Sequence, residues 1–276
     1  MKKFAKVLSA FVLTSALLTG CGSSETSDQS VKMGMITSLN ASEQKIDEVL
    51  KLASEKSGLK LVPHTTTFYK NLSTMQMGLE SGSVNEISTY ESVAKYLIAK
   101  NPKMELVPQH GMSLSDSFCF AMRKSDESLK KDIDKAINAM KKDGTLDKLV
   151  KQYITDANAD DPPAVEMPKF DGAETLKVAV TGDLPPLDLV LADGKPAGFN
   201  TALIAELAKR INRNIEIIDI DGDARASALS SNRADVIFWA IIPVGDDRAK
   251  DIDTPEDAIL SEPYFTDKIT HIKIKN

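Results

Sequence analysis

Cysteine and histidine are scarce in this chain of 276 residues, and their scarcity excludes several kinds of protein. Its two cysteines, Cys21 and Cys119, are too few for a disulfide framework. The three histidines are scattered along the chain, and no two have the spacing of metal ligands: His64, His110 and His271. We therefore expect neither a metal site nor a bound cofactor.

Basic residues are outnumbered, with 34 Lys and Arg against 40 Asp and Glu, a formal net charge of −6. An acidic chain without a basic run argues against nucleic-acid binding and against an electrostatic membrane patch. The segment 219–223, Asp-Ile-Asp-Gly-Asp, hints at calcium, but its glycine comes fourth rather than sixth as in an EF-hand loop. A strand end and turn is the better interpretation.

Long apolar runs are also absent after residue 20, where no segment is long enough to span a membrane. Before it, three lysines within the first six residues flank an apolar run over 4–18 that is too short for a spanning helix. This layout is typical of a secretory signal peptide. Residues 22–30 are small and polar and predict a flexible tether.

Short apolar runs alternate with amphipathic stretches in the first half of the remaining chain. They predict strands at 31–36, 59–62 and 84–88 and helices at 46–53, 72–79 and 93–98, with Asn40 as an N-cap. A strand at 118–122, a helix over 129–140 and a short helix after Thr145 follow. The proline-rich, acidic segment 156–174 predicts a linker.

From residue 176 the alternation begins again, with strands at 177–180, 215–220 and 236–239 and a helix over 200–212. Such alternation predicts an α/β fold with mostly parallel sheets flanked by helices. Ligands of these sheets bind at the carboxyl ends of the strands, so the loops after Val180 and Trp239 are the expected site.

Four motifs of the second half resemble family 3 of the bacterial extracellular solute-binding proteins. They are Leu176-Lys-Val-Ala-Val-Thr-Gly-Asp-Leu-Pro-Pro-Leu-Asp188, Asp193-Gly-Lys-Pro-Ala-Gly-Phe-Asn200, Ala228-Leu229 with Ala234-Asp235-Val236-Ile237, and Ser261-Glu-Pro-Tyr264. The resemblance covers residues 176–276. It implies a two-lobed type II periplasmic-binding-protein fold, and the members of the family are mostly amino-acid receptors of ABC importers.

The first half resembles the later part of the same family, through Gly78-Leu79-Glu-Ser-Gly82, Phe120-Ala-Met-Arg-Lys124 and Lys142-Asp-Gly-Thr-Leu146. The segment order therefore predicts a circular permutation; the alternative is a tandem of two truncated copies. The predicted units are a signal peptide (1–20), a tether (21–30), lobe 2 (31–110), a hinge crossing with the return segment of lobe 1 (111–155), a linker (156–174) and the main part of lobe 1, ending in a hinge strand (175–276).

The permutation also predicts how the hinge is built. The strand-like tail 269–274 should run beside 117–122, residues 31 and 276 should meet at the hinge, and the linker should wrap lobe 1.

The resemblance implies a ligand-binding arginine in the loop after the strand at 236–239. Counting along the family motif places it at Arg248, where its planar guanidinium would grip a ligand carboxylate. The alternative is a surface arginine paired with a neighbouring aspartate. Trp239 and Ala240 replace a small pair of the family; Trp239 would stack on the ligand or belong to the core.

Other expected ligand contacts come from both lobes. Asp183, Leu184 and Asp188 follow the first strand of lobe 1, although Asp188 also suits a turn cap. In lobe 2, Ser38 and Asn40 stand at a helix start that suits a carboxylate. The aspartate that binds the ligand's amino group in the family aligns with Tyr90. The substitute is either the neighbouring Glu91 or the aromatic face of Tyr90, which would bind a ligand cation.

At the N-terminal end, Leu18-Thr-Gly-Cys21 resembles the lipobox of bacterial lipoproteins, which implies a lipid on Cys21; an ordinary signal peptide is the alternative. The expected function is a monomeric, extracytoplasmic, lipid-anchored binding protein that delivers a small amino-acid-like ligand to an ABC permease. An enzyme on the same scaffold is the rival, with Glu91 and Asp188 as the candidate acid and base. A ligand sensor is the third possibility.

Overall fold

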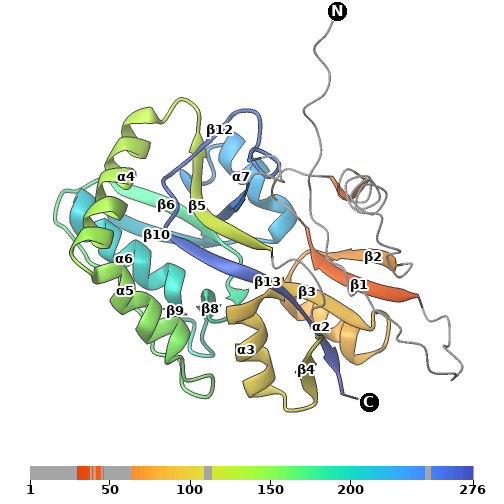
Figure 1. The fold of residues 1–276 in the computed structure, drawn as a ribbon. Coiled ribbons are helices and arrows are strands. Elements are labelled where there is room, and N and C mark those ends of the chain that lie inside the picture. The colour runs from red at the N-terminus through yellow and green to blue at the C-terminus, as the bar shows by residue number, and fades with distance from the viewer. Residues whose placement is uncertain are drawn as a thin grey trace, which may run out of the picture.

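The structure is a computed structural model that describes residues 30–37, 39, 42–44, 46, 64–108, 114–245 and 250–275. Across these residues ten strands form one continuous sheet, in the order β10-β6-β11-β5-β13-β3-β1-β2, with β12 beside β5 and β4 beside β13. We call the half containing β5, β6, β10, β11 and β12 lobe 1 and the half containing β1 to β4 lobe 2 (Figure 1). The prediction of a two-lobed α/β fold is confirmed.

Lobe 1 takes its strands from both sides of the linker. They are β5 (Ser115–Arg123), β6 (Thr175–Val180), β10 (Asn214–Asp219), β11 (Val236–Pro243) and β12 (Ala258–Leu260). β6, β10 and β11 are parallel, whereas β5 runs antiparallel to β11 and β12. The described residues therefore do not form one complete sheet from 31–155 and a separate one from 175–276.

Lobe 2 is a smaller sheet built on three parallel strands. Its strands are β1 (Val31–Ile36), β2 (His64–Tyr69), β3 (Glu86–Tyr90) and β4 (Met104–Leu106). β2 was not predicted, and the strand predicted at 59–62 lies outside the described residues. Two helices of lobe 2 lie fully within the described residues, α2 (Leu72–Glu80) and α3 (Glu91–Lys100), each close to its predicted position.

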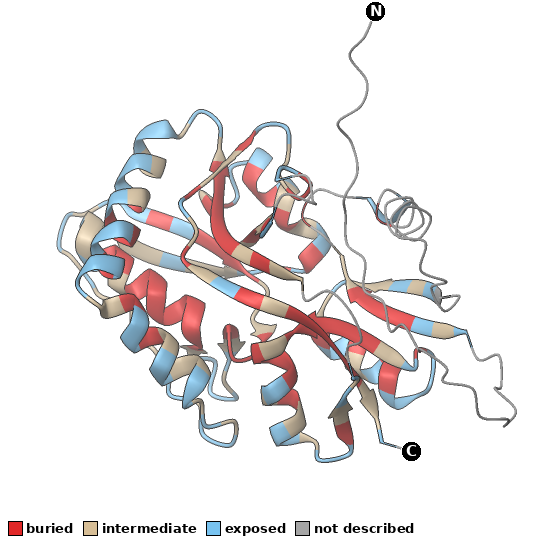
Figure 2. Cartoon of the chain, viewed as in Figure 1, coloured by how far each residue is buried: buried red, intermediate tan, exposed pale blue. Residues whose placement is uncertain are grey.

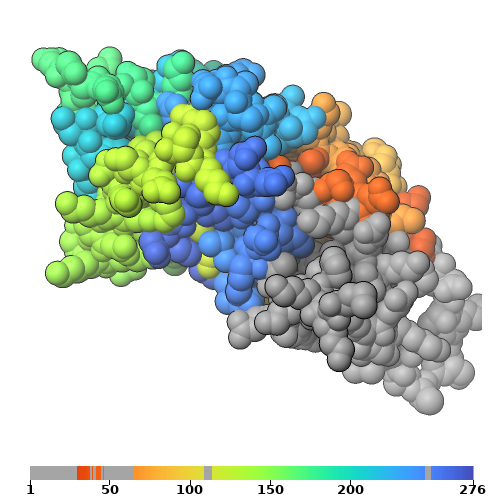
Figure 3. All heavy atoms as spheres, turned by 90° about the horizontal axis from the view of Figure 1, so that it is seen from above, coloured from red at the N-terminus to blue at the C-terminus, as the bar shows by residue number. Residues whose placement is uncertain are grey.

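The last strand, β13 (Phe265–Ile274), joins the two lobes. Its residues 265–268 pair with 115–118 of β5, and residues 269–274 pair with β3 and β4 of lobe 2. The prediction that 269–274 runs beside 117–122 is therefore wrong, because a strand of ten residues is long enough to leave one sheet half and continue in the other. Figure 3 shows these C-terminal residues between segments from early and late in the chain.

The chain ends do not meet at the hinge as predicted. β1 is parallel to β3, and β13 is antiparallel to it, so Val31 and Ile274 lie at the same end of the lobe 2 sheet, with β3 between their strands. That end is remote from lobe 1, whereas β13 passes between the lobes near Lys268. Asn276 itself lies outside the described residues.

Helices flank the lobe 1 sheet and bury its faces, as the burial pattern in Figure 2 shows. They are α4 (Glu127–Lys142), α5 (Thr145–Val150) with a π-helical turn (Lys151–Thr155), α6 (Phe199–Ile211) and α7 (Arg225–Ser230), which follows a 3-10 turn (Gly222–Ala224). The amphipathic period of α4 buries Ile133, Ile137 and Met140. Gly144, with φ 75°, ends that helix in the left-handed conformation that favours glycine.

A small second sheet extends the loop region after β6. It consists of β7 (Asp183–Leu184), β8 (Asp188–Val190) and β9 (Pro196–Ala197). The linker 156–174 reaches this sheet through a bridge between Ala164 and Ala197, but it first crosses lobe 2, where the Tyr96 hydroxyl donates to the carbonyl of Ala159 over 3.1 Å. It therefore lies over both lobes rather than wrapping lobe 1 alone. None of the described helices is both long and apolar enough to cross a membrane.

Candidate functional site

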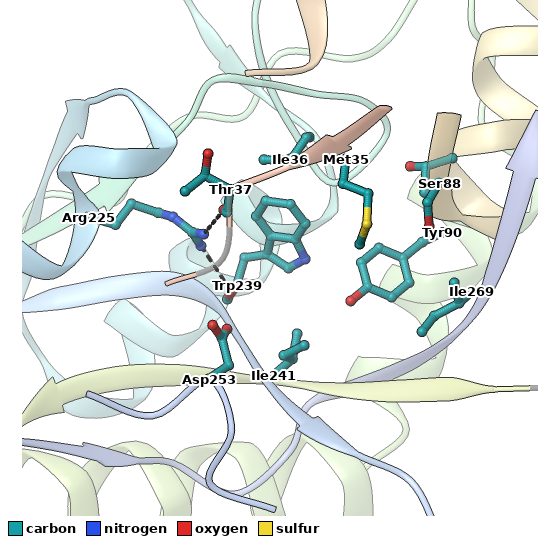
Figure 4. Close-up of a pocket in the computed structure, with 11 residues that line it drawn as sticks. Met35, Ile36, Thr37, Ser88, Tyr90, Arg225, Trp239, Ile241, Asp253 and Ile269 are labelled. Atoms are coloured by element: carbon teal, nitrogen blue, oxygen red, sulfur yellow. Dashed lines mark hydrogen bonds between the residues drawn. The ribbon is translucent and has the colours of Figure 1, made fainter. Parts of the chain in front are cut away.

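A cavity of about 60 Å³ lies between the lobes, where β1, β3 and β11 converge (Figure 4). Lobe 2 lines it with Met35, Ile36, Thr37, Ser88, Thr89 and Tyr90, lobe 1 with Arg225, Trp239, Ile241 and Asp253, and β13 with Ile269. The carboxyl ends of the parallel strands β1 and β3 point to it, which is where open α/β sheets bind ligands.

Trp239 reaches this cavity because β11 is irregular at that point. Ile237 pairs with Ala121 and Ala240 with Cys119, so β11 has one more residue than β5 between these two pairs, which is a β-bulge. Trp239 has φ 65°, a conformation that is strained for a large side chain. The bulge turns its indole ring toward the cavity, opposite Tyr90 and at 6.2 Å between ring centroids.

Arg225 is the largest of the fully buried side chains described, with 2% of its surface exposed. Its Nη1 donates to the carbonyl of Trp239 over 3.0 Å, its Nε to Gly222 over 3.1 Å, and its Nη2 to Thr37 of lobe 2 over 3.3 Å. Its guanidinium carbon lies 4.9 Å from the centroid of the Trp239 ring, a cation–π distance. Burial lowers the pKa of Arg225, while the negative charge of Asp253 opposes that shift.

Asp253 supplies the opposite charge. This carboxylate is 4% exposed, and its Oδ1 accepts a hydrogen bond of 2.7 Å from the backbone N–H of Leu39 in lobe 2. A buried carboxylate is expensive unless it is compensated by a cation and hydrogen bonds. Asp253 and Arg225 thus compensate each other, and each also binds a backbone group of the opposite lobe.

Tyr90 forms the wall of the cavity across from Trp239. It precedes α3, and its hydroxyl donates to Oδ2 of Asp116 over 2.9 Å. Its ring meets the edge of Phe118 at 4.7 Å between centroids. The hydroxyl is thus used within the protein, and the ring offers an aromatic surface to a ligand.

Further contacts join the lobes beside the cavity. Gly222 donates its N–H to the carbonyl of Lys70 over 3.1 Å, and a Cβ on Gly222 would lie 2.6 Å from that oxygen. Only glycine permits this approach. Asp183 accepts from the N–H and the hydroxyl of Ser73, at 3.1 and 3.3 Å, at the start of α2.

The sequence of the chain places it in a known family. The model of the bacterial extracellular solute-binding proteins, family 3, matches residues 45–156 and 176–273. The chain belongs to this family. The predicted resemblance is therefore confirmed, and it extends over most of the chain.

Individual relatives are more distant or match shorter stretches. A probable histidine-binding protein of Campylobacter jejuni subsp. jejuni is 31% identical over 102 residues, so the match spans only 37% of this chain and 37% of that relative's length. A ligand-binding component of an ABC-type import system from Staphylococcus aureus, with zinc bound, has 10% identity and a TM-score of 0.46, over 89% of this chain and 66% of that one. A nutrient-binding protein from Burkholderia cenocepacia bound to methionine has 14% identity and a TM-score of 0.42, over 88% and 84%.

The family-based site predictions fall into three groups. Trp239 and Tyr90 line the cavity. Ala240 is buried next to Trp239 without lining it, and Leu184 is part of the lobe 1 core, 1% exposed, so neither reaches the cavity. Arg248, Ser38, Asn40 and Cys21 lie outside the described residues.

The three predicted carboxylates do not line the inter-lobe cavity. Asp183 binds Ser73 across the lobes, and Glu91 pairs with Lys95 at 2.6 Å on α3, beside a second cavity of about 320 Å³ that it shares with Asp267. Asp188 is buried within lobe 1, so the candidate acid and base of the rival enzyme hypothesis line no common cavity among those described.

Asp188 has the turn-capping role that was its alternative. Its Oδ2 accepts from the N–H and the hydroxyl of Thr181, both at 3.1 Å, and from the N–H of Gly182 at 3.3 Å. Burial raises the pKa of Asp188 to about 6, although these hydrogen bonds favour the ionised form. The carboxyl group thus shapes the loop after β6 instead of facing a ligand.

Sequence reasoning missed Arg225 and Asp253, the two buried charges of the site. Arg225 lies three and four residues before Ala228 and Leu229, which are the other buried residues of α7. A charged residue on the apolar face of a short helix is unusual and is a signal that could have identified it. Asp253 carries no comparable local signal.

Proposed function

We propose that this chain is the substrate-binding protein of an ABC importer and that it binds an amino acid or a similar small polar metabolite between closing lobes. The observation that supports this most is that the buried charges of the cavity bridge the lobes: Arg225 donates to Thr37, and Asp253 accepts from Leu39. Opening of the lobes breaks both contacts, so closure assembles the pocket. Ligand binding would then stabilise the closed state.

The size of the cavity supports a cycle of opening and closing. Its volume of about 60 Å³ has room for only ~4–6 water-sized groups, at ~10–15 Å³ each. Most amino acids are larger. The lobes must therefore part to admit such a ligand and close around it afterwards, in the manner of hinge-bending binding proteins.

Calorimetry on the mature protein with each of the twenty amino acids, and glucose as a control, tests this function. L-Histidine is titrated first, since the Campylobacter relative is described as a probable histidine-binding protein. We expect one compound or a small group to bind with 1:1 stoichiometry and to reduce the radius of gyration in solution scattering. No binding by any amino acid or similar small polar metabolite contradicts the proposal.

Family membership places the chain outside the cytoplasm, and we propose that a lipid on Cys21 holds it at the membrane beside its permease. The motif that ends at Cys21 supports this anchor. Cells fed an alkyne-labelled fatty acid should label the wild-type protein and release the unlabelled Cys21→Ser variant from the membrane fraction. Equal labelling of both excludes a lipid on this cysteine.

We also propose that the chain is a circular permutation of the usual family order. This is supported by β5, from residues 115–123, lying beside β11 and β12 in the lobe 1 sheet. A chain rejoined through a short loop between Ile274 and Val31, with new ends in 156–174, should fold and bind as the parent does. The tandem alternative instead predicts that 31–155 and 175–276 fold separately.

A further inference from the structure

The indole N–H of Trp239 is an unsatisfied donor in the inter-lobe cavity. Nε1 is buried, and no acceptor lies within hydrogen-bond distance of it among the described residues. Figure 4 shows the nitrogen on the side of the ring that faces Tyr90, across the cavity. An indole can only donate, and buried donors without a partner are rare because they lose their bond to water. A partner from outside the protein would restore that bond.

The backbone at the same residue is strained. Trp239 has φ 65° within a β-bulge, which directs the ring into the cavity instead of along the sheet face. Strained conformations of bulky residues persist where the surrounding structure enforces them, and they concentrate at functional sites. A second unfavourable feature thus coincides with the unpaired N–H at this tryptophan.

Arg225 enforces this conformation. Its Nη1 donates to the carbonyls of Phe238 and Trp239, at 3.5 and 3.0 Å, and its guanidinium covers one face of the indole. Nη2 already donates to Thr37, so the paired donors that grip a carboxylate in bidentate fashion are committed to backbone oxygens. In this closed arrangement Arg225 holds Trp239 and lobe 2 rather than a ligand.

We infer that the indole N–H of Trp239 is the donor that determines which ligands bind, and that Arg225 is the residue that positions it; this inference rests on the proposed function. The ligand accordingly presents an oxygen acceptor, such as an amino-acid carboxylate, to Nε1. Its apolar part lies against the ring of Tyr90 and the side chains of Met35, Ile241 and Ile269. This describes an amino acid with a small or apolar side chain.

Trp239 is the sole tryptophan of the chain, so replacing every tryptophan alters this position alone. The decisive variant carries benzothienylalanine, in which sulfur replaces the N–H and the ring shape is kept. It should bind the amino acids found for the wild type at least tenfold more weakly, and its folding should be unaffected. In the wild type, the one indole ¹H–¹⁵N signal should shift downfield when the amino acid is added.

Arg225→Lys tests the positioning role, with Arg213→Met, which alters a surface arginine paired with Glu174, as the control. The lysine variant should weaken binding about tenfold and move the indole signal even without a ligand, whereas the control should change neither. Unchanged affinity of the benzothienyl protein, or an unshifted indole signal at saturation, overturns the inference and leaves the proposed function standing. If neither an amino acid nor a similar small polar metabolite binds the wild type, the proposed function fails and this inference fails with it.

Discussion

The two lobes contribute different chemistry to the buried charge contacts between them. Lobe 1 provides the side chains of Arg225 and Asp253, whereas lobe 2 provides the backbone carbonyl of Thr37 and the backbone N–H of Leu39. Backbone groups cannot be removed by substitution, so the side chains of lobe 1 are the variable half of the contact. Closure therefore depends on how lobe 1 holds its buried charges.

Two buried aspartates of lobe 1 show how position changes the role of a charge. Asp188 binds only its own loop, through Thr181 and Gly182. Asp253 lies beside the Arg225 cation and binds the other lobe. Burial is similar for both, at 3% and 4% exposure, and the charge of Arg225 acts on both, so the hydrogen bond to the partner lobe distinguishes them.

The largest loss of stability is expected from Arg225→Met. The change removes the cation that compensates Asp253 and the hydrogen bonds to Trp239 and Thr37. Leaving a buried charge uncompensated typically costs about 3–5 kcal/mol of the free energy of unfolding. Urea denaturation at pH 7 measures this cost. Arg213→Met should stay within ~0.5 kcal/mol of the wild type; equal effects of the two variants contradict the assigned role of Arg225.

Asp188→Asn should change the free energy of unfolding in the opposite direction, by an amount that depends on pH. Burial raises the pKa of Asp188 to about 6, so the folded protein holds this proton more tightly than the unfolded chain does. The stabilisation that results is complete below pH ~4, where the carboxyl group is protonated in both states, and it is lost as the pH rises through 6. Relative to the wild type, the asparagine variant should therefore gain up to about 3 kcal/mol between pH 4 and pH 8.

Urea denaturation of both proteins across this pH range tests the assignment, because a constant cost of the new amide cancels in the difference. Asp253→Asn is the matched comparison, since it should destabilise the protein at pH 7 by leaving Arg225 without its compensating anion. A difference between Asp188→Asn and the wild type that stays constant with pH excludes a raised pKa for Asp188.

Gly222→Ala should hinder the closure of the two lobes, with a smaller free-energy effect than the changes above. The new Cβ would approach the Lys70 carbonyl to 2.6 Å, so the lobes cannot reach their closed distance without a shift of the backbone. We expect ligand affinity to fall about tenfold, or ~1.4 kcal/mol, while the unfolding of the unliganded protein changes little. Calorimetry measures the affinity, and scattering should show a larger radius with ligand present. Wild-type affinity places the Gly222 contact outside the closure interface.

The sequence predicts the regular elements of this fold where their local pattern is strong. The amphipathic period of α4 and the apolar runs of β5 and β6 were sufficient. β2 escaped prediction because its sequence, His-Thr-Thr-Thr-Phe-Tyr, shows little alternation of apolar and polar residues. The division of β13 between two lobes depends on partners far away in the chain, which no local pattern reveals.

Only part of the candidate site could be predicted, because its other contacts also join residues that are far apart in the chain. Family resemblance led to Trp239 and Tyr90, which line the cavity. The roles of Arg225 and Asp253 depend on Thr37 and Leu39, which are 188 and 214 residues away in the sequence. Only the three-dimensional structure brings these groups together, and the arginine that the family pattern assigns to the ligand, Arg248, lies outside the described residues.

The smallest effect is expected from Lys70→Ala, which separates side-chain from backbone contributions at the lobe contact. The Lys70 ammonium lies 2.9 Å from Asp223, but the two side chains are 65% and 41% exposed, and exposed ion pairs contribute little. The carbonyl that accepts from Gly222 is retained in the variant. Ligand affinity should remain within about twofold of the wild type and respond little to salt. A loss as large as that of Gly222→Ala would mean that the ion pair, and not the close backbone approach, holds the lobes together on this side of the pocket.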